Sequence, residues 1–422
     1  MHKETIAIHQ GYDNQETGTM AVPIYQTTAY AFRDAEHAAN LFALKELGPI
    51  YTRLNNPTTD ILEKRYAALE GGAAALCTAS GQSAVFFALV NCAEAGDNII
   101  ISDKLYGGTV TLTTHTFKRF GITARIFNSS DASDLENLVD DQTKAIYFES
   151  LSNPQTAIPH IERIVQIAQK KGVLTICDNT VATAALFNPI DWGVDVVVHS
   201  TSKYTTGQGL ALGGVIIERE GLNSFFKQSS RYSQFNTPDE SYHGLVYSEV
   251  PFPAFTLRAR LSLIRDLGAA PAPFNSWLLI QGLETLGIRM EKHSANALAV
   301  ARFLNNHPKV KTVAYPGLET DSQHERALKY FKNGLSSGLF NFEVSSFEEA
   351  VKIINSVKLF SIVTNIGDSK SIITHPASTT HQQMTPDDLK SAGISPGLIR
   401  LSIGLEHPSD LIEDLDTALN KE

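Results

Sequence analysis

Three segments carry side chains able to do chemistry, and each one comes just after a run of β-forming residues. Asp178 follows the run VLTIC, Lys203 closes a short polar segment after DVVVH, and Asn153 stands four positions after KAIYFE. When such strands are parallel, their carboxyl ends meet at one edge of a sheet, where ligands bind. We therefore expect an acid, an amine and an amide to lie together at that edge.

This set of groups meets the needs of pyridoxal phosphate. A lysine amine must bond to the cofactor's aldehyde and later move protons, so burial and cationic neighbours should lower its pKa. A carboxylate must pair with the pyridine nitrogen and keep it protonated, because the positive ring is the electron sink. Lys203 and Asp178 are 25 positions apart (203 − 178), the length of one crossover between neighbouring strands. We expect Lys203 to hold the cofactor and Asp178 to charge its ring.

The phosphate of such a cofactor needs hydrogen-bond donors. Ser80, Gly81 and Gln82 open an expected helix, whose free amides and dipole suit an anion. Ser200 and Ser202, just before the lysine, can add hydroxyls. Serine and glycine before a helix are often only a cap, so this signal depends on the lysine and the acid.

The elements that must position these groups have an α/β pattern. Ile161, Ile164, Val165 and Ala168 form one apolar helical stripe that ends at Gly172. Further helices are expected over 81–94 and after two capping boxes, Ser133 with Glu136 and Ser346 with Glu349. The expected strands are 98–102, 124–128, 144–149, 173–177, 195–199 and 213–218. Apolar strands alternating with amphipathic helices predict a mostly parallel sheet covered on both faces.

The pattern divides the chain into three parts. Residues 1–58 show no steady hydrophobic period, which predicts an N-terminal arm that lies against another surface. Residues 59–267 carry the α/β pattern of a large cofactor-binding domain. Residues 268–422 mix long helical patterns, at 274–307 and 346–357, with strand-like runs, which predicts a smaller α+β domain.

Composition excludes several classes of partner. The 422 residues include 35 basic and 45 acidic ones, and a net charge of −10 disfavours nucleic acid. The longest apolar stretch, 84–93, is about half a membrane span, and no signal-peptide core opens the sequence. The three cysteines do not have the spacing of a metal site or of a disulfide framework. No predicted strand leads into a helix that begins with GxGxxG, which disfavours a nucleotide-binding oxidoreductase. We expect a cytoplasmic enzyme without metal, membrane or nucleic acid, rather than a binding module that has merely kept the fold.

Five segments also carry a resemblance to a known family. They are Tyr51 to Pro57, Ser80 to Gln82, Tyr106 to Thr109, Asp178 to Thr180 and His199 to Tyr204. In order and spacing they resemble the Cys/Met-metabolism family of pyridoxal-phosphate enzymes over nearly the whole chain. The resemblance implies fold type I and a homotetramer built from intimate dimers, with active sites shared between subunits.

The resemblance also implies roles for individual residues. Tyr51 and Arg53 would reach the phosphate bound in the neighbouring subunit, which explains the arm. Tyr106 would stack on the ring and assist as an acid or base, and Asn153 would touch the ring hydroxyl. Arg400 would bind the substrate carboxylate, a task suited to a bidentate guanidinium.

The C-terminal half resembles one branch of this family, O-acetylhomoserine sulfhydrylase. The similar segments are 238–245, 365–371 and 375–381, and they place Asn365 among the substrate-binding residues. The branch implies replacement of acetate by sulfide or another sulfur donor, forming homocysteine for methionine biosynthesis. Methionine γ-lyase typically has Cys where Gly108 stands, which counts against that alternative, while a transsulfuration enzyme of the cystathionine γ-synthase type also stays open. Ala184 and Ser202 depart from the family's usual Pro and Thr.

Overall fold

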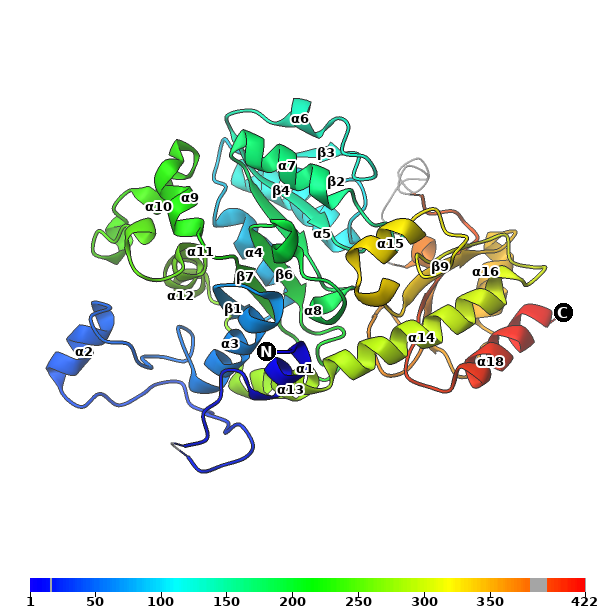
Figure 1. Cartoon of the computed structure of the whole chain (residues 1–422), viewed down its shortest axis with the longest axis horizontal. Coiled ribbons are helices and arrows are strands. Elements are labelled where there is room, and N and C mark those ends of the chain that lie inside the picture. Colours follow the sequence, from blue (N-terminus) through cyan, green and yellow to red (C-terminus); the bar gives the residue numbers. More distant parts are fainter. Residues whose placement is uncertain (16, 380–392, 422) are drawn as a thin grey trace.

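Two β-sheets organise the molecule (Figure 1). The structure is a computed structural model, and it describes residues 1–15, 17–379 and 393–421. A seven-stranded sheet has the order β1-β7-β6-β5-β4-β2-β3, and a five-stranded sheet has the order β10-β11-β12-β9-β8. The predicted fold class, a mostly parallel large sheet with a smaller C-terminal sheet domain, is confirmed.

The large sheet is parallel except for β7, which runs antiparallel to both β1 and β6. Its strands are β1 (Ala74–Thr78), β2 (Asn98–Ser102), β3 (Thr123–Phe127), β4 (Thr143–Glu149), β5 (Leu174–Asp178), β6 (Val196–Ser200) and β7 (Gly214–Glu218). The six predicted strands agree with the structure to within a residue. The prediction missed β1, because AALCT has only one residue typical of strands.

Both faces of the large sheet are buried, and successive side chains point to opposite faces. On β4, Ile146 and Phe148 join one core cluster, while Ala145 and Tyr147 join another. The first cluster includes apolar residues of α3 (Pro57–Glu70) and α7 (Ile161–Lys171). The second includes those of α4 (Gly81–Val90) and α11 (Ala254–Arg258). Other helices around this sheet have at most 7 residues: α5 (Gly107–Thr111), α6 (Leu135–Leu138), α8 (Thr183–Leu186), α9 (Leu222–Gln228), α10 (Ser233–Asn236) and α12 (Arg265–Leu267).

Helix ends follow local chemistry, with two corrections to the predicted ends. Helix α7 ends at Gly172 in the left-handed conformation, as the stripe predicts, and α4 ends at Val90 rather than at residue 94. The Ser346 hydroxyl accepts a bond from Glu349 N, as a capping box requires. The box predicted at Ser133 is wrong, because the short helix α6 is preceded by Asp134, whose carboxylate instead accepts a bond from the backbone of residue 128.

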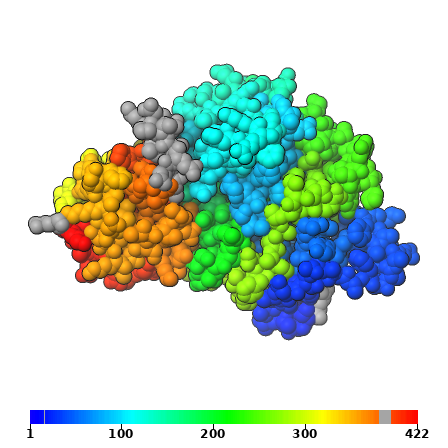
Figure 2. All heavy atoms as spheres, turned by 180° about the vertical axis from the view of Figure 1, so that it is seen from behind, coloured from blue at the N-terminus to red at the C-terminus, as the bar shows by residue number. Residues whose placement is uncertain are grey.

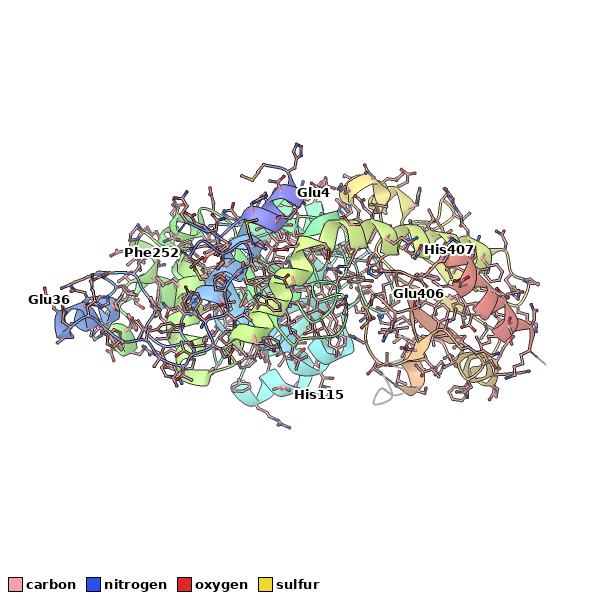
Figure 3. All side chains as sticks on the ribbon, turned by 90° about the horizontal axis from the view of Figure 1, so that it is seen from below. Glu4, Glu36, His115, Phe252, Glu406 and His407 are labelled. Carbon is pink, nitrogen blue, oxygen red and sulfur yellow. The ribbon has the colours of Figure 1, made fainter. Side chains whose placement is uncertain are left out.

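The small sheet contains β8 (Thr312–Ala314), β9 (Leu339–Glu343), β10 (Ser361–Ile362), β11 (Ile372–Thr374) and β12 (Leu398–Ser402). It shares a core with α16 (Phe347–Ile354), α18 (Pro408–Asn420) and part of α14, while α15 (His324–Tyr330) lies nearer the large sheet. The helical pattern predicted over 274–307 is two helices, α13 (Pro273–Glu284) and α14 (Leu286–Asn305), divided at Thr285. Helix α13 packs on α3, and α14 runs from there to the small sheet (Figures 1 and 3). The domain limits expected from the sequence, 1–58, 59–267 and 268–422, stay predictions.

The first 56 residues form an extended segment with two short helices, α1 (Lys3–His9) and α2 (Ala35–Phe42). Helix α2, which carries Glu36, lies at one extreme of the molecule, opposite the small sheet (Figures 2 and 3). Several large apolar side chains of this segment are exposed, among them Met20, Phe42 and Leu47. In the described part of the chain, no helix combines the length and apolar character needed to cross a membrane.

Candidate active site

The carboxyl edge of the large sheet gathers the predicted reactive groups. Asp178 ends β5, Glu149 ends the neighbouring strand β4, and Ser200 ends β6 on the other side. Asp178 is paired in register with Glu149 and with Val198, so β4 and β5 end level and β6 extends two residues further. Lys203 follows three residues beyond Ser200, with its backbone N–H donating to Ser200 O at 3.3 Å.

The Asp178 carboxylate is held in a fixed orientation. Its Oδ1 accepts from Thr180 N at 2.9 Å, and its Oδ2 accepts from the hydroxyl of Tyr147 at 3.1 Å. Burial raises the pKa of Asp178, with the bonds from Thr180 opposing the rise. A cation in contact with this carboxylate offsets that effect of burial. The geometry therefore suits an acid that pairs with a protonated ring nitrogen.

Lys203 meets a residue from the small-sheet region. Its Nζ donates to Asn365 Oδ1 at 2.8 Å. Burial lowers the pKa of Lys203, and the positive charge of Arg400 lowers it further. Both effects favour the free amine, which is the form that can bond to an aldehyde or accept a proton.

Arg400, in the middle of β12, is a buried guanidinium that is only 3% exposed. Nη1 donates to Asn153 Oδ1 at 3.0 Å, and Nη2 donates to Asn365 O at 3.1 Å and to Thr374 Oγ1 at 3.4 Å. Among the described residues, its Nε has no hydrogen-bond partner and no carboxylate forms an ion pair with it. Burial lowers the pKa of Arg400 to about 10, with Tyr106 and Tyr204 opposing. A buried cation of this kind suits an anionic ligand.

Donors for a phosphate lie beside the end of β6. The Ser80 hydroxyl caps α4 by accepting from Ser83 N at 3.1 Å, while the amides of Gly81 and Gln82 have no partner within the described residues. A Cβ on Gly81 would stand 2.4 Å from the Cβ of Ser200, so only glycine lets this helix start approach β6 so closely. The Ser200 hydroxyl likewise has no partner in the described part of the chain.

Two further predicted residues border this edge. Tyr106 precedes α5 and is partly exposed, and its ring lies so close to Gly108 that a Cβ there would stand 2.5 Å from Tyr106 Cε1. The Ser202 hydroxyl accepts from Gly213 N at 3.0 Å and lies 3.3 Å from Gly213 O. Ser202 is thus already bonded to the backbone, which leaves Ser200 as the freer hydroxyl.

The structure does not bring every predicted residue together. Tyr51 and Arg53 lie on the N-terminal segment, where the Arg53 guanidinium stands 5.4 Å from the Tyr51 ring centroid and Tyr51 is 41% exposed. Within this chain they contact each other rather than Lys203 or Asp178. In the predicted segment 375–381, residues 380 and 381 lie outside the described residues.

Three residues near the site were not predicted from the sequence. Thr374 supports Arg400, Tyr147 supports Asp178, and Glu149 accepts bonds from the backbones of the loops that carry Tyr106 and Asn153. Of these three, only Glu149 had a signal in the sequence, because it is an acid at the end of an apolar strand. Together the site offers a free amine, an oriented acid, an anion-binding helix start and a buried guanidinium, the donor set that suits pyridoxal phosphate and an amino acid.

Comparison with known proteins supports this interpretation. Residues 4–420 match the profile of the family described as "Cys/Met metabolism PLP-dependent enzyme". The chain is 49% identical to O-acetyl-L-homoserine sulfhydrylase of Leptospira meyeri, over 99% of this chain and 96% of the relative. It is 45% identical to homocysteine synthase of Schizosaccharomyces pombe, over 99% and 98% of the two chains.

A solved structure is also similar over its whole length. It is a Campylobacter jejuni protein named as a candidate O-acetylhomoserine (thiol)-lyase, with a TM-score of 0.98, 53% identity and 100% of both chains covered. That protein carries N'-pyridoxyl-lysine-5'-monophosphate at position 205 of its own chain. With the family match and these identities, the chain belongs to the Cys/Met metabolism family of PLP-dependent enzymes.

Proposed function

We propose that this enzyme replaces the γ-acetate of O-acetylhomoserine with a sulfur nucleophile, releasing homocysteine for methionine biosynthesis. The observation that carries the proposal is Arg400, a buried guanidinium beside Lys203 and Asn365 whose Nε has no partner among the residues that the structure describes. A substrate carboxylate supplies the missing negative charge and directs the amino-acid backbone toward the lysine amine. The relatives named above, a sulfhydrylase and a homocysteine synthase, support the choice of reaction.

The residues at the sheet edge fit the cofactor as a set. Asp178 would pair with its ring nitrogen, Tyr106 would stack on the ring and Asn153 would touch its ring hydroxyl. The amides of Gly81 and Gln82 and the hydroxyls of Ser80, Ser200 and Ser202 would bind the phosphate, together with Tyr51 and Arg53 of a neighbouring subunit. When bound, pyridoxal phosphate withdraws electrons from the substrate's α-carbon, which makes loss of protons and of the γ-substituent possible.

The chain's own groups then bind the substrate and move its protons. Arg400 and Asn365 hold the substrate carboxylate, which positions the α-carbon over Lys203. Lys203 Nζ, whose pKa is lowered by burial and by Arg400, accepts the α-proton, passes it on, and as a free amine again accepts a β-proton. Once acetate has left and sulfur has added at the γ-carbon, the same amine returns protons. The hydroxyl of Tyr106 assists as an acid or base.

We also infer a cytoplasmic homotetramer made of intimate dimers. The exposed Tyr51 and Arg53, on a segment rich in exposed apolar side chains, support active sites shared between subunits. The three free and buried cysteines support a reducing compartment.

Steady-state kinetics with sulfide test the proposed reaction. Homocysteine should form with the highest kcat/KM from the O-acetyl ester of homoserine, compared with the O-succinyl and O-phospho esters. Methanethiol in place of sulfide should show whether the γ-carbon accepts a bulkier donor. A 2-oxo acid released from methionine as the dominant product would instead establish a γ-lyase, and efficient use of cysteine to form cystathionine would establish a transsulfuration enzyme.

A further inference from the structure

Glu149 is a buried acid that connects two loops of the site. It is the last residue of β4 and only 5% exposed. Its Oε1 accepts from Tyr106 N at 2.6 Å, and its Oε2 accepts from Asn153 N at 3.1 Å. The first loop follows β2 and the second follows β4. One carboxylate therefore fixes the separation of two segments from different strands.

Both segments carry groups that the proposed site places around the cofactor ring. Tyr106 presents its ring from one loop, and Asn153 presents its amide from the other. Asn153 Oδ1 also accepts the bond from Arg400 Nη1, so the second loop connects to the substrate-binding guanidinium as well. A shift in either loop would thus move a group that touches cofactor or substrate.

The acidic groups around Glu149 also favour the binding of a cationic group nearby. Glu149 is paired in register with Asp178, and no lysine or arginine of the described residues forms an ion pair with it. Burial and the neighbouring Asp178 raise the pKa of Glu149 well above its ordinary value. Two adjacent carboxyl groups without a cation are costly, and a protonated ring nitrogen on Asp178 offsets that cost.

We propose that Glu149 is a positioning residue that sets the distance between the Tyr106 and Asn153 loops and so holds both against the cofactor ring. The inference rests on the proposed function, because it assigns Tyr106 and Asn153 to that ring. It predicts that the orientation of the bound cofactor, and not only the stability of the fold, depends on both oxygens of Glu149.

The chain contains a matched control in Glu218. This acid is fully buried and accepts from Phe255 N at 3.2 Å and from Thr256 N at 2.7 Å, so it too joins two backbone amides. It ends β7, which is antiparallel and pairs Glu218 with Val196 at the start of β6. Glu218 therefore lies at the edge of the sheet opposite to the site.

The test compares purified holoenzymes of Glu149→Gln, Glu149→Asp and Glu218→Gln. Glutamine keeps one acceptor oxygen but places its amide NH₂ group, a donor, opposite the second backbone N–H. Aspartate is one methylene too short to reach both loops. Both Glu149 variants should show altered visible circular dichroism of the bound cofactor and a fall in kcat of roughly 10- to 100-fold. Glu218→Gln should lower the melting temperature without changing that spectrum or kcat.

Wild-type spectra and kcat in both Glu149 variants would overturn the inference, and so would an equal spectral change in Glu218→Gln. If Glu149→Gln does not fold, the spectrum of Glu149→Asp decides. A wild-type protein without the visible cofactor band would instead overturn the proposed function, which keeps the two failures distinct.

Discussion

Lys203 and Asn365, which are 162 positions apart, meet through a 2.8 Å hydrogen bond between Lys203 Nζ and Asn365 Oδ1. The backbone oxygen of the same asparagine accepts from Arg400 Nη2 at 3.1 Å. One residue thus orients both the amine proposed to do the chemistry and the guanidinium proposed to bind the substrate. Its neutral amide does so without adding a negative charge beside the lysine.

Asn365→Asp should move the pH profile of cofactor reconstitution upward. Burial and Arg400 lower the pKa of Lys203 from its ordinary 10.5, so the free amine is present at lower pH than usual. A carboxylate at position 365 favours the ammonium form, and reconstitution at neutral pH should slow by roughly tenfold for each unit of pKa gained. Stopped-flow absorbance measures this rate. Asn365→Ala, which adds no charge, is the control, and coincident profiles for Asp and wild type would contradict the account.

Arg400→Met and Arg289→Met should separate binding from stability. Arg289 is also a buried arginine with no carboxylate partner in the part of the chain that the structure describes, but it donates to the carbonyls of Tyr204, Thr205 and Gly282. Losing it removes three hydrogen bonds to buried carbonyls, of which Gly282 O keeps one from the Thr285 hydroxyl, and each buried carbonyl left unpaired costs about 1–3 kcal/mol, so the melting temperature should fall. Arg400→Met should instead raise KM for O-acetylhomoserine by roughly 10- to 100-fold with a smaller change in melting temperature. Equal effects of the two variants on KM would argue against Arg400 as the carboxylate site.

Gly108→Ala and Gly108→Cys should impair the enzyme to a similar degree. Any Cβ at this position would stand 2.5 Å from Tyr106 Cε1, so the ring has to turn. A displaced ring should lower kcat/KM for the ester by about tenfold or more, since small misplacements at a reacting centre are costly. Kinetics of both variants check this, and an alanine variant with wild-type kinetics would show that the close packing is unimportant.

Mixing two inactive variants tests the shared active sites. Arg53→Met lacks the phosphate contact it would donate to a neighbour, and Lys203→Ala lacks its own amine. Co-expressed chains should form mixed dimers with one intact site, restoring up to roughly one quarter of wild-type activity at random pairing. The mixture is assayed beside each variant alone. No gain over the separate variants would mean that Arg53 acts within its own subunit or not at all.

Much of the fold could be predicted because its signals are local. The strands β4, β5 and β6 are continuous apolar runs, and Asp178 and Lys203 lie at or just beyond their ends, so the parallel pattern alone placed them at one edge. Strand β1 was not predicted because alanine and cysteine have little preference for β-strands. The division of one long helical pattern at Thr285 also has no clear local signal.

The contacts that complete the site could not be predicted from spacing. Arg400 meets Asn153 across 247 positions, and Lys203 meets Asn365 only because the two sheets lie side by side. The bond that Gly213 N donates to the Ser202 hydroxyl depends on how the loop after Lys203 folds back. The proposed contact of Tyr51 and Arg53 with the phosphate in a neighbouring chain lies outside one subunit, so the single chain does not test it.

Borohydride reduction of the purified enzyme, followed by peptide mass spectrometry, shows directly whether Lys203 holds the cofactor. Reduction makes the bond between cofactor and lysine permanent, so the modified peptide identifies the lysine. The account predicts bleaching of the visible band and a phosphopyridoxyl mass on the peptide that contains Lys203. A label on another lysine, such as Lys3, whose pKa burial also lowers, or no label at all would contradict it.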